Sequence, residues 1–253
     1  MKRNDLLILA AGRGSRMGSA TKNIPKICLK VNGKTILENQ LEIYKKFNLR
    51  EISIVTGYLN HKLEFIDFTK IYNPYWYKTN MLFSLYCARD LLRKNGSLIV
   101  VYSDIIFNEN VFKKIYLSNF DTAIIQDANW KNLWEKRFVN IFEDAESLIL
   151  DNDLQQVLEI GKKTGTIRNI QGQYIGITKI GPIMKKKILQ IFKKFINSNL
   201  SFVSNKKIEN CYMTDLLQYM IEKKEKINFE TIHGGWFEFD TMQDLKTFKQ
   251  NYK

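Results

Sequence analysis

Short apolar runs alternate with segments of helical periodicity through the first half of the chain. The runs of strand length predict β-strands at residues 6–9, 52–55, 98–102 and 123–125. Segments with apolar residues on one helical face predict helices at residues 36–47, 81–92 and 111–117. The first of these helices has its apolar face at Ile36, Leu37, Leu41 and Tyr44. Continuous apolar strands separated by helices are typical of a parallel sheet covered on both faces.

The second half has shorter strands, some with alternating polar and apolar residues. We expect strands at residues 139–142, 148–150, 156–160 and 173–180, and an amphipathic helix at 182–196. A helix at 214–223, a strand at 229–232, the segment GGWFEFD and a helix at 242–252 end the chain. The pattern predicts an α/β fold with a mixed, mainly parallel sheet flanked by helices and a small antiparallel extension. No Pro-, Gly- or Ser-rich linker and no repeat interrupts it, so we expect one domain over residues 1–253.

The composition favours a soluble enzyme or binding protein of the cytoplasm. The chain of 253 residues is 45% hydrophobic and 26% charged, and no apolar run approaches the roughly 18 residues needed to cross a bilayer. The apolar run that ends at Ala11 is too short for a signal-peptide core. The widely spaced Cys28, Cys87 and Cys211 fit no metal-binding pattern, and we interpret them as buried, reduced thiols.

The net charge of +13 favours an anionic partner, which is either a polyphosphate metabolite or a nucleic acid. Much of the excess lies in lysine runs spread along the chain, such as 185–187, 193–194 and 206–207, and such runs are typical of a solvated surface. A basic nucleic-acid-binding module is therefore the alternative of a different class. It predicts binding to DNA or RNA that weakens steeply with salt and does not need Asp104.

The glycine-rich segment LLILAAGRGSRMG directly follows the first predicted strand. In open α/β sheets this position lies at the ligand crevice. Its glycines, Gly12, Gly14 and Gly18, have one residue too many for the dinucleotide fingerprint, and the segment lacks the ending of a P-loop. Backbone N–H groups beside Arg13 and Arg16 suit a triphosphate. The alternative is a tight turn with solvated arginines.

At these residues the chain resembles the nucleotidylyltransferases of the sugar-nucleotide transferase family, in which L-A-A-G-x-G-x-R-M is followed by P-K. The resemblance implies a Rossmann-like, GT-A-like nucleotidyltransferase fold. It implies that Arg16 faces the leaving phosphates and that Lys26, in Ile24-Pro25-Lys26, faces the α-phosphate as the second catalytic residue. Residues about 1–130 would form the nucleotide-binding half and 131–253 the acceptor-binding half. The implied nucleotide-binding loop consists of Leu9, Ala10, Ala11, Gly12, Arg13 and Gly14.

Two aspartates at strand ends are candidate metal ligands. Transfer at the α-phosphorus requires a divalent cation, and carboxylate oxygens bind Mg²⁺ well. Asp104 ends the strand LIVVYSD and Asp240 follows WFEF, and both match metal-binding aspartates of the family. Glu238 is a weaker candidate. Either aspartate could instead cap a helix or complete a turn.

The implied reaction is a single in-line displacement by an acceptor phosphate oxygen, with pyrophosphate as the leaving group. Lys26, Arg16 and Mg²⁺ would hold the charge on the reacting phosphates. No protein nucleophile is required, and we expect His61 and His233 to be structural.

The segment NPYWYKTNMLFSL, residues 73–85, departs from the base-reading segment of sugar-1-phosphate uridylyl- and thymidylyltransferases. It resembles that of the CTP:phosphocholine cytidylyltransferases, with Asn80 and Ser84 near the base. An amide and a hydroxyl can pair with the amino and carbonyl groups of cytosine. Asn80 could also cap the helix that begins at residue 81.

The acceptor is a small phosphorylated compound. Overall likeness favours the CTP:phosphoglutamine cytidylyltransferases of bacterial capsule phosphoramidate synthesis, while phosphocholine and sugar 1-phosphates remain alternatives. A choline group would need an aromatic cage. We expect neither a nucleic-acid nor a membrane partner, and a monomer or homodimer. A relative that binds CTP without turnover is a further alternative. The cage candidates are Trp130, Trp134, Tyr174 and Trp236, and the other acceptor-binding candidates are Arg168, Lys179, Asp215 and Glu238.

Overall fold

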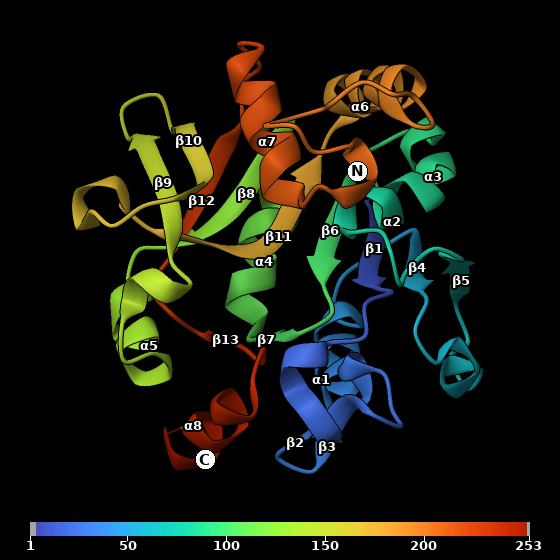
Figure 1. Cartoon of the computed structure of the whole chain (residues 1–253), viewed down its shortest axis with the longest axis vertical. Coiled ribbons are helices and arrows are strands. Elements are labelled where there is room, and N and C mark those ends of the chain that lie inside the picture. The colour runs from blue at the N-terminus through green and yellow to red at the C-terminus, as the bar shows by residue number, and fades with distance from the viewer. Residues whose placement is uncertain (1–3, 252–253) are drawn as a thin grey trace.

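A mixed sheet of nine strands organises the protein in a computed structural model, which describes residues 4–251 (Figure 1). The strand order is β5-β4-β1-β6-β11-β8-β12-β10-β9. β5, β4, β1 and β6 are parallel, β11 is antiparallel to both β6 and β8, and β8 and β12 are parallel. β10 is antiparallel to both β12 and β9, and β9 forms one edge of the sheet. The predicted α/β fold with a small antiparallel extension is confirmed.

The central strands β1, β6 and β8 of the main sheet are short and almost wholly buried. Every residue of β1 is buried, as expected for a strand covered on both faces. The strands of this sheet are β1 (Asp5–Ala10), β4 (Glu51–Thr56), β5 (Thr69–Tyr72), β6 (Leu98–Tyr102), β8 (Thr122–Asp127), β9 (Glu146–Asp151), β10 (Gln156–Lys163), β11 (Gln173–Ile180) and β12 (Asn228–Ile232). Two small sheets pair β13 (Trp236–Glu238) with β7 (Ile105–Phe107) and β2 (Lys30–Val31) with β3 (Lys34–Thr35).

Helices cover both faces of the sheet. The α-helices are α1 (Ile36–Tyr44), α2 (Met81–Cys87), α3 (Arg89–Arg93), α4 (Glu109–Leu117), α5 (Trp130–Arg137), α6 (Pro182–Phe195), α7 (Met213–Glu222) and α8 (Met242–Asn251). Short 3₁₀ segments are η1 (Ser15–Thr21), η2 (Lys26–Cys28), η3 (Asn60–Leu63), η4 (Ile141–Glu143), η5 (Ile167–Asn169) and η6 (Ile208–Asn210). None of the helices in the described part of the chain is long and apolar enough to cross a membrane.

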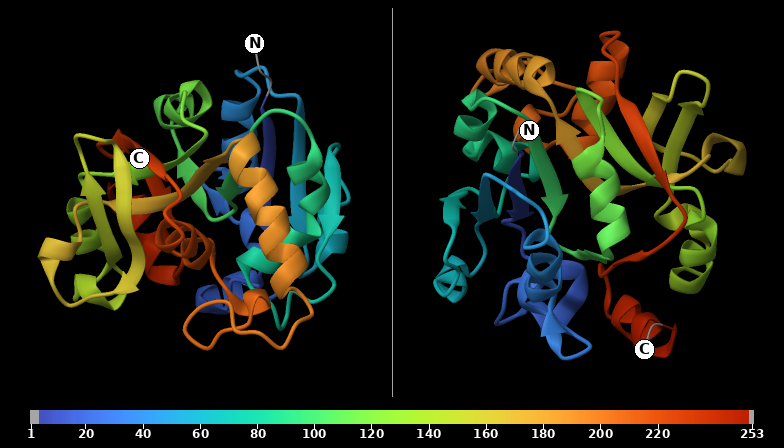
Figure 2. Two further views of the ribbon diagram at one scale, coloured as in Figure 1. Left: turned by 90° about the horizontal axis from the view of Figure 1, so that it is seen from above. Right: turned by 180° about the vertical axis from the view of Figure 1, so that it is seen from behind.

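The alternation of side chains along β1 divides the core into two layers. Leu6 and Ile8 pack with α1, α4, α5 and α8, whereas Leu7 and Leu9 pack with α2, α3, α6 and α7. Seen from behind, α4 lies in front of the sheet, on the side opposite α6 (Figure 2). Apolar side chains on both faces of β1 are thus buried against helices, which holds the strand in place. The loop after its carboxyl end therefore starts from a rigid position.

Most predicted elements are present, with local corrections. The strand expected at 139–142 is wrong, because Val139 is fully exposed and the Asn140 side chain accepts a hydrogen bond from Phe142 N at 3.1 Å, which starts the 3₁₀ turn η4. The helix expected at 81–92 is broken at Ala88, whose φ of −90° and ψ of 16° separate α2 from α3. The strands β2, β3, β5 and β7 and the helix α5 were not predicted.

Two further expectations concern the last helix and the cysteines. The last helix was expected to reach residue 252, which lies outside the described residues, and α8 ends at Asn251. The three cysteines are free, as expected. Only Cys211 is fully buried, whereas Cys28 and Cys87 are partly exposed.

Candidate active site

The glycine-rich loop leaves β1 at its carboxyl end and turns sharply at Gly14. Gly14 has a φ of +65°, and a Cβ atom there would lie 3.0 Å from Cδ of Lys26. A glycine is therefore needed both for the left-handed backbone and for the close passage of the lysine. At Gly12 a Cβ atom would meet nothing within 4 Å, so the loop borders open space at that point.

Lys26 is the buried cation of the site. It begins the 3₁₀ turn η2 directly after Pro25, and only 8% of the residue is exposed. Its Nζ donates to Asp104 Oδ2 at 2.7 Å and to Asp240 Oδ1 at 2.6 Å. Burial disfavours the charged form, but the Asp104 and Asp240 carboxylates outweigh it and raise the pKa of Lys26 above its ordinary value. The ammonium therefore stays charged at neutral pH.

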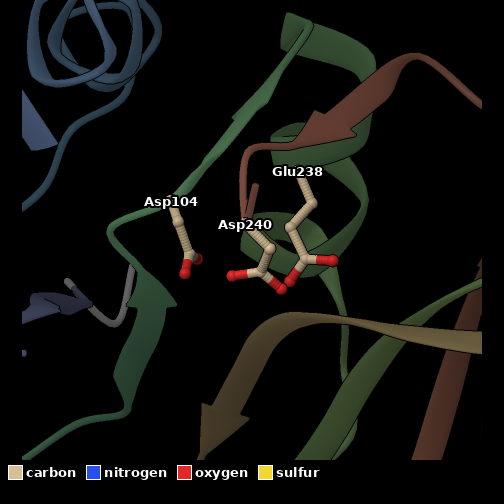
Figure 3. A group of neighbouring side chains, drawn as sticks. All are labelled: Asp104, Glu238 and Asp240. Carbon is tan, nitrogen blue, oxygen red and sulfur yellow. The ribbon is translucent and has the colours of Figure 1, made fainter. Parts of the chain in front are cut away.

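Asp104, Glu238 and Asp240 form a carboxylate cluster, with one ligand oxygen from each within 4.8 Å of the others (Figure 3). The antiparallel pairing of β13 with β7 brings these distant segments together, with Glu238 opposite Ile105. The backbone N–H of Phe239 donates to the Asp104 carbonyl at 2.9 Å, which fixes the two turns against each other.

The cluster has the properties of a divalent-cation site. All its donors are oxygen atoms, which Mg²⁺ and Ca²⁺ prefer. Asp104 Oδ1 is buried and has no hydrogen-bond partner among the described residues, so one carboxylate oxygen is left to a ligand. Burial and the neighbouring Asp240 raise the pKa of Glu238 to about 8, and a bound cation would relieve that cost.

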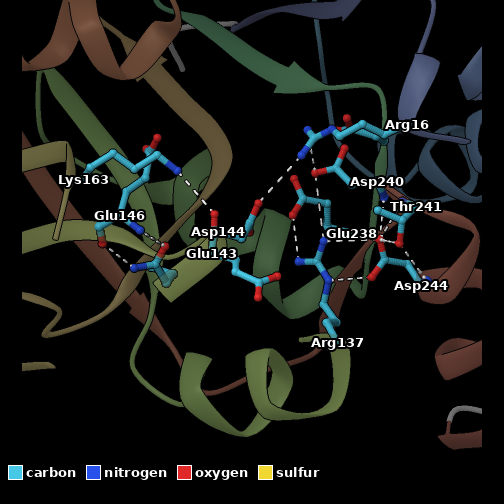
Figure 4. Close-up of polar contacts among 12 residues, drawn as sticks. Arg16, Arg137, Glu143, Asp144, Glu146, Lys163, Glu238, Asp240, Thr241 and Asp244 are labelled. Carbon is cyan, nitrogen blue, oxygen red and sulfur yellow. Dashed lines mark hydrogen bonds and ion pairs between the residues drawn. The ribbon is translucent and has the colours of Figure 1, made fainter. Parts of the chain in front are cut away.

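Arg137 supports the cluster from beneath (Figure 4). Its side chain is fully buried, with Nη1 2.8 Å from Glu238 Oε2 and Nε 2.8 Å from Asp244 Oδ1. Asp244 Oδ2 in turn accepts from the backbone N–H groups of Asp240 at 2.9 Å and Thr241 at 2.7 Å. The turn that contains Asp240 is thus fixed by a buried network between α5 and α8.

Arg16 reaches the cluster from the glycine-rich loop. Its Nη2 lies 3.1 Å from Asp240 Oδ2, and its Nη1 lies 3.8 Å from Asp144 Oδ1. The arginine side chain is 64% exposed, so it can turn toward a ligand. Arg13 points elsewhere, because its guanidinium lies 5.7 Å from the ring centre of Tyr58.

A first cavity of about 220 Å³ opens between the loop, Lys26 and the start of α2. The loop residues that line it are Leu9, Ala11, Gly12, Gly14, Ser15 and Arg16, whereas Ala10 packs in the core layer on the opposite face and Arg13 is not in the lining. Asn73, Trp76, Thr79, Asn80, Met81 and Ser84 form the other wall. Asp104 and Asp240 also line the cavity, so that it borders both this wall and the carboxylate cluster.

Asn73 organises the wall that contains Asn80 and Ser84, and it was not predicted. Only 1% of it is exposed, and its Nδ2 donates to Ser84 Oγ and to Thr79 Oγ1, each at 3.2 Å. Asn80 Oδ1 accepts from Met81 N at 3.0 Å, so Asn80 both caps α2 and lines the cavity. Asn73 directly follows β5, a parallel strand, and that position could have marked it as a candidate. The sequence pattern did not predict β5, so this signal was missed.

A second cavity of about 380 Å³ adjoins the first and shares Arg16, Met81, Tyr102, Asp104 and Asp240 with it. The lining that belongs to the second cavity alone consists of Trp134, Asp144, Glu146, Lys163, Gln173, Tyr174, Tyr212, Thr214 and Glu238. The carboxylate cluster therefore lies at the junction of two cavities, which is the arrangement needed to bring two substrates together.

Only some of the expected acceptor residues lie at this second cavity. Tyr174 and Glu238 line it, and so does the tryptophan Trp134. Arg168 lies on the exposed turn η5, outside the linings of both cavities. Lys179 also lies outside both linings, because it is buried near the end of β11 that pairs with the start of β6, where its Nζ donates to the Ser118 carbonyl.

Asp215 is a helix-capping residue here and is not in the lining of the cavity. Its Oδ2 accepts from Tyr212 N at 2.8 Å at the start of α7, and its Oδ1 lies 3.5 Å from Lys206 Nζ. Trp130 and Trp236 are core residues packed around Trp134. Of the four aromatic candidates for a cage, only Trp134 and Tyr174 line the second cavity.

Comparison with known proteins identifies the family. Residues 6–159 match the MobA-like NTP transferase domain. The chain is 35% identical to CTP:phosphoglutamine cytidylyltransferase of Campylobacter jejuni over 95% of this chain and 97% of that protein. The chain belongs to the MobA-like NTP transferase family, among its cytidylyltransferases.

Further relatives agree with this placement. The cytidylyltransferase is 34% identical to choline-phosphate cytidylyltransferase of Haemophilus influenzae over 42% of this chain and 46% of that protein. Its fold matches that of CTP:phosphocholine cytidylyltransferase from Streptococcus pneumoniae with a TM-score of 0.77 and 21% identity, over 99% of this chain and 100% of that chain. The predicted family, fold and enzyme class are confirmed.

Proposed function

We propose that this cytidylyltransferase transfers the CMP group of CTP to L-glutamine phosphate, with Mg²⁺ as cofactor and pyrophosphate as the second product. The observation that carries the proposal is the 35% identity to CTP:phosphoglutamine cytidylyltransferase, which extends over nearly the whole of both chains. Two choline-phosphate cytidylyltransferases match at 34% and 30% identity over 42% and 60% of this chain.

CTP would occupy the first cavity. The proposed base contacts are Asn80 and Ser84, and the bond between Ser84 Oγ and the buried Asn73 supports this placement. The open space at Gly12 would take the triphosphate, held by backbone N–H groups of the loop. Leu9, Ala11 and Gly14 would line the same site, while Ala10 and Arg13 support it from outside the lining.

Asp104 and Asp240 would hold Mg²⁺, and Glu238 lies close enough to contribute a third oxygen. When bound there, the cation would offset the charge of the triphosphate. Lys26 and Arg16 are the cations of the chain that would stabilise the charge on the α-phosphate and on the leaving pyrophosphate. Lys26, which donates to Asp104 and Asp240 in this structure, would hold the charge on the α-phosphate when those carboxylates hold the cation.

The acceptor would occupy the second cavity with its phosphate toward the junction. Its phosphate oxygen is already ionised, so the protein needs to supply orientation and charge rather than a nucleophile. Trp134 and Tyr174 line this cavity and would contact the apolar part of the acceptor. Direct attack on the α-phosphorus then forms the new P–O bond and breaks the bond to pyrophosphate.

We further infer a division of labour within one domain, with residues about 1–130 binding the nucleotide and 131–253 the acceptor. The single sheet with strands from both halves supports this. CTP and a phosphorylated acceptor are cytoplasmic metabolites, so we propose a cytoplasmic enzyme of capsule phosphoramidate synthesis. It would act as a monomer or homodimer without nucleic acid.

The experiment that tests the proposal measures pyrophosphate release by the purified protein. CTP, UTP, ATP and GTP are each combined with L-glutamine phosphate, phosphocholine or a sugar 1-phosphate, with Mg²⁺ or with chelator. We expect release only with CTP, L-glutamine phosphate and Mg²⁺. Asp104→Asn should abolish it, whereas Asp153→Asn, an exposed aspartate in the turn between β9 and β10, should not. A marked preference for another acceptor would overturn the proposed function.

A further inference from the structure

Glu146 and Lys163 face each other across the hairpin of β9 and β10. The antiparallel register places Lys163 opposite Glu146, so both side chains project from the same face of the sheet. Both residues line the second cavity. A carboxylate and an ammonium thus lie side by side in the cavity wall, at the end away from Lys26.

No hydrogen bond or ion pair joins these two side chains in the described part of the chain, although the Lys163 charge lowers the pKa of Glu146. Lys163 Nζ donates to the Glu143 carbonyl at 3.4 Å (Figure 4). Within residues 4–251 no hydrogen bond or ion pair reaches the Glu146 carboxylate, although its backbone is fixed by two hydrogen bonds with the Gln173 side chain, at 3.4 and 2.6 Å. Burial raises the pKa of Glu146 to about 7, as expected for a carboxylate that lacks a partner.

The neighbouring charged groups are already engaged. Asp144 Oδ1 lies 3.8 Å from Arg16 Nη1, and Glu238 Oε2 lies 2.8 Å from Arg137 Nη1. Figure 4 shows Arg16 and Glu238 on one side of Asp144 and Lys163 with Glu146 on the other. The cavity therefore has one end beside the carboxylate cluster and another end with one carboxyl group that has no hydrogen-bond partner among the described residues and one ammonium group.

We propose that Glu146 and Lys163 recognise the zwitterionic amino-acid group of the acceptor, with Glu146 accepting from its α-ammonium and Lys163 donating to its α-carboxylate. This inference rests on the proposed function and extends it to the specificity of the acceptor site. Each contact is a charge-assisted hydrogen bond. A choline group has no N–H to donate and no carboxylate, and it would bring a second cation close to Lys163. The pair therefore selects amino-acid phosphates against phosphocholine.

The test compares Michaelis constants of the full-length enzyme with Mg²⁺ for L-glutamine phosphate, O-phosphoserine, phosphoethanolamine and phosphocholine. The variants are Glu146→Gln and Lys163→Gln, with Lys162→Gln as the matched control. Lys162 Nζ donates to Glu159 Oε2 at 2.6 Å, and Lys162 is not in the lining of the second cavity. Thermal unfolding of each variant shows whether the fold is intact, and the KM for CTP reports on the first cavity.

We expect Glu146→Gln and Lys163→Gln each to raise the KM for L-glutamine phosphate by about tenfold or more, with the KM for CTP unchanged. Phosphoethanolamine has the ammonium but no carboxylate, so its KM should respond to Glu146→Gln and not to Lys163→Gln. Lys163→Arg should restore binding, and Lys162→Gln should have no effect.

The outcomes separate the two proposals. An unchanged KM for L-glutamine phosphate in both folded variants would overturn the zwitterion inference and leave the proposed function intact. A wild-type preference for O-phosphoserine, with the same two losses, would overturn the proposed acceptor and leave the inference standing. A wild-type preference for phosphocholine would overturn both.

Discussion

The Nζ atom of Lys26 lies 2.7 Å from Asp104 Oδ2 and 2.6 Å from Asp240 Oδ1, so one buried ammonium bridges two carboxylates from distant parts of the chain. The same carboxylates belong to the cluster with divalent-cation geometry. The lysine therefore balances part of the negative charge of the carboxylate cluster in this structure.

Removal of this ammonium should affect both catalysis and stability. We expect Lys26→Met to lower kcat by at least about a hundredfold, because a preorganised cation is lost from the reacting phosphate. In chelator it should lower the free energy of unfolding by about 3 kcal/mol, because two buried carboxylates lose their partner. Added Mg²⁺ should recover part of that loss. Lys30→Met, at an exposed lysine of β2, is the control, and urea unfolding with and without Mg²⁺ is the measurement.

The buried Arg137 should position the metal ligands without touching substrate. Arg137→Met leaves Glu238 and Asp244 without their partner, and we expect a loss of about 3 kcal/mol or more in urea unfolding. Arg137→Lys keeps the charge but not the bonds to both carboxylates, and should fold. For that variant we expect weaker Mn²⁺ binding in a calorimetric titration. Wild-type Mn²⁺ affinity in Arg137→Lys would argue against a positioning role.

Two glycines of the loop should differ in what they contribute. Gly14→Ala introduces a side chain at a φ of +65° and against Lys26, so we expect a loss of stability of about 1–2 kcal/mol together with reduced activity. Gly12→Ala meets open space in the protein, so we expect normal stability and a raised KM for CTP. Thermal unfolding and steady-state kinetics on both variants distinguish the two roles. Equal effects of the two substitutions on unfolding would contradict this assignment.

Ser84 and Asn73 should set the preference for cytosine. Ser84→Ala removes a hydroxyl that lines the first cavity and leaves Asn73 without one of its partners. We expect the ratio of kcat/KM for CTP to that for UTP to fall by about tenfold, because a missing hydrogen bond costs on the order of 1 kcal/mol. Ser15→Ala, at the loop end of the same cavity, should leave the ratio unchanged. A constant ratio in Ser84→Ala would place base selection elsewhere.

Glu146 should make the ligand-free protein less stable as the pH rises. Its folded pKa of about 7 lies above its ordinary value because of burial, with Asp144 and Asp215 raising the pKa further and Lys163 and Lys206 lowering it. The folded state thus holds a proton that the unfolded chain releases, so the free energy of unfolding falls between about pH 4.5 and pH 7. The fall from this one group is at most about 3 kcal/mol. Urea unfolding of Glu146→Gln over this range should show a shallower decline than the wild type.

The loop and the lysine at the first cavity could be predicted because their signals are local. The loop from Leu9 to Gly18 follows an apolar strand, and Pro25 precedes Lys26 within the same short stretch, so spacing along the chain and the family pattern were enough. Asp104 and Asp240 could be predicted as neighbours because both follow apolar strands, although their pairing through β7 and β13 was not foreseen.

The acceptor half was decided by tertiary structure. Lys179 and Arg168 are cations in the right half of the chain, yet the direction of β11 and the exposed turn η5 keep them away from the cavity. Lys163 lies there instead, because the register of β9 with β10 sets it opposite Glu146.

The sequence by itself determined most strands and helices of the central sheet, the glycine loop and the candidate residues for phosphate and metal chemistry, because periodicity and backbone freedom act over a few residues. Only the tertiary structure decided that Arg137 lies beneath the carboxylates, that Asn73 supports Ser84 and that Glu146 and Lys163 share a wall. Those relations depend on strand register and on which helices meet across the sheet, and such long-range pairings leave no local pattern to read.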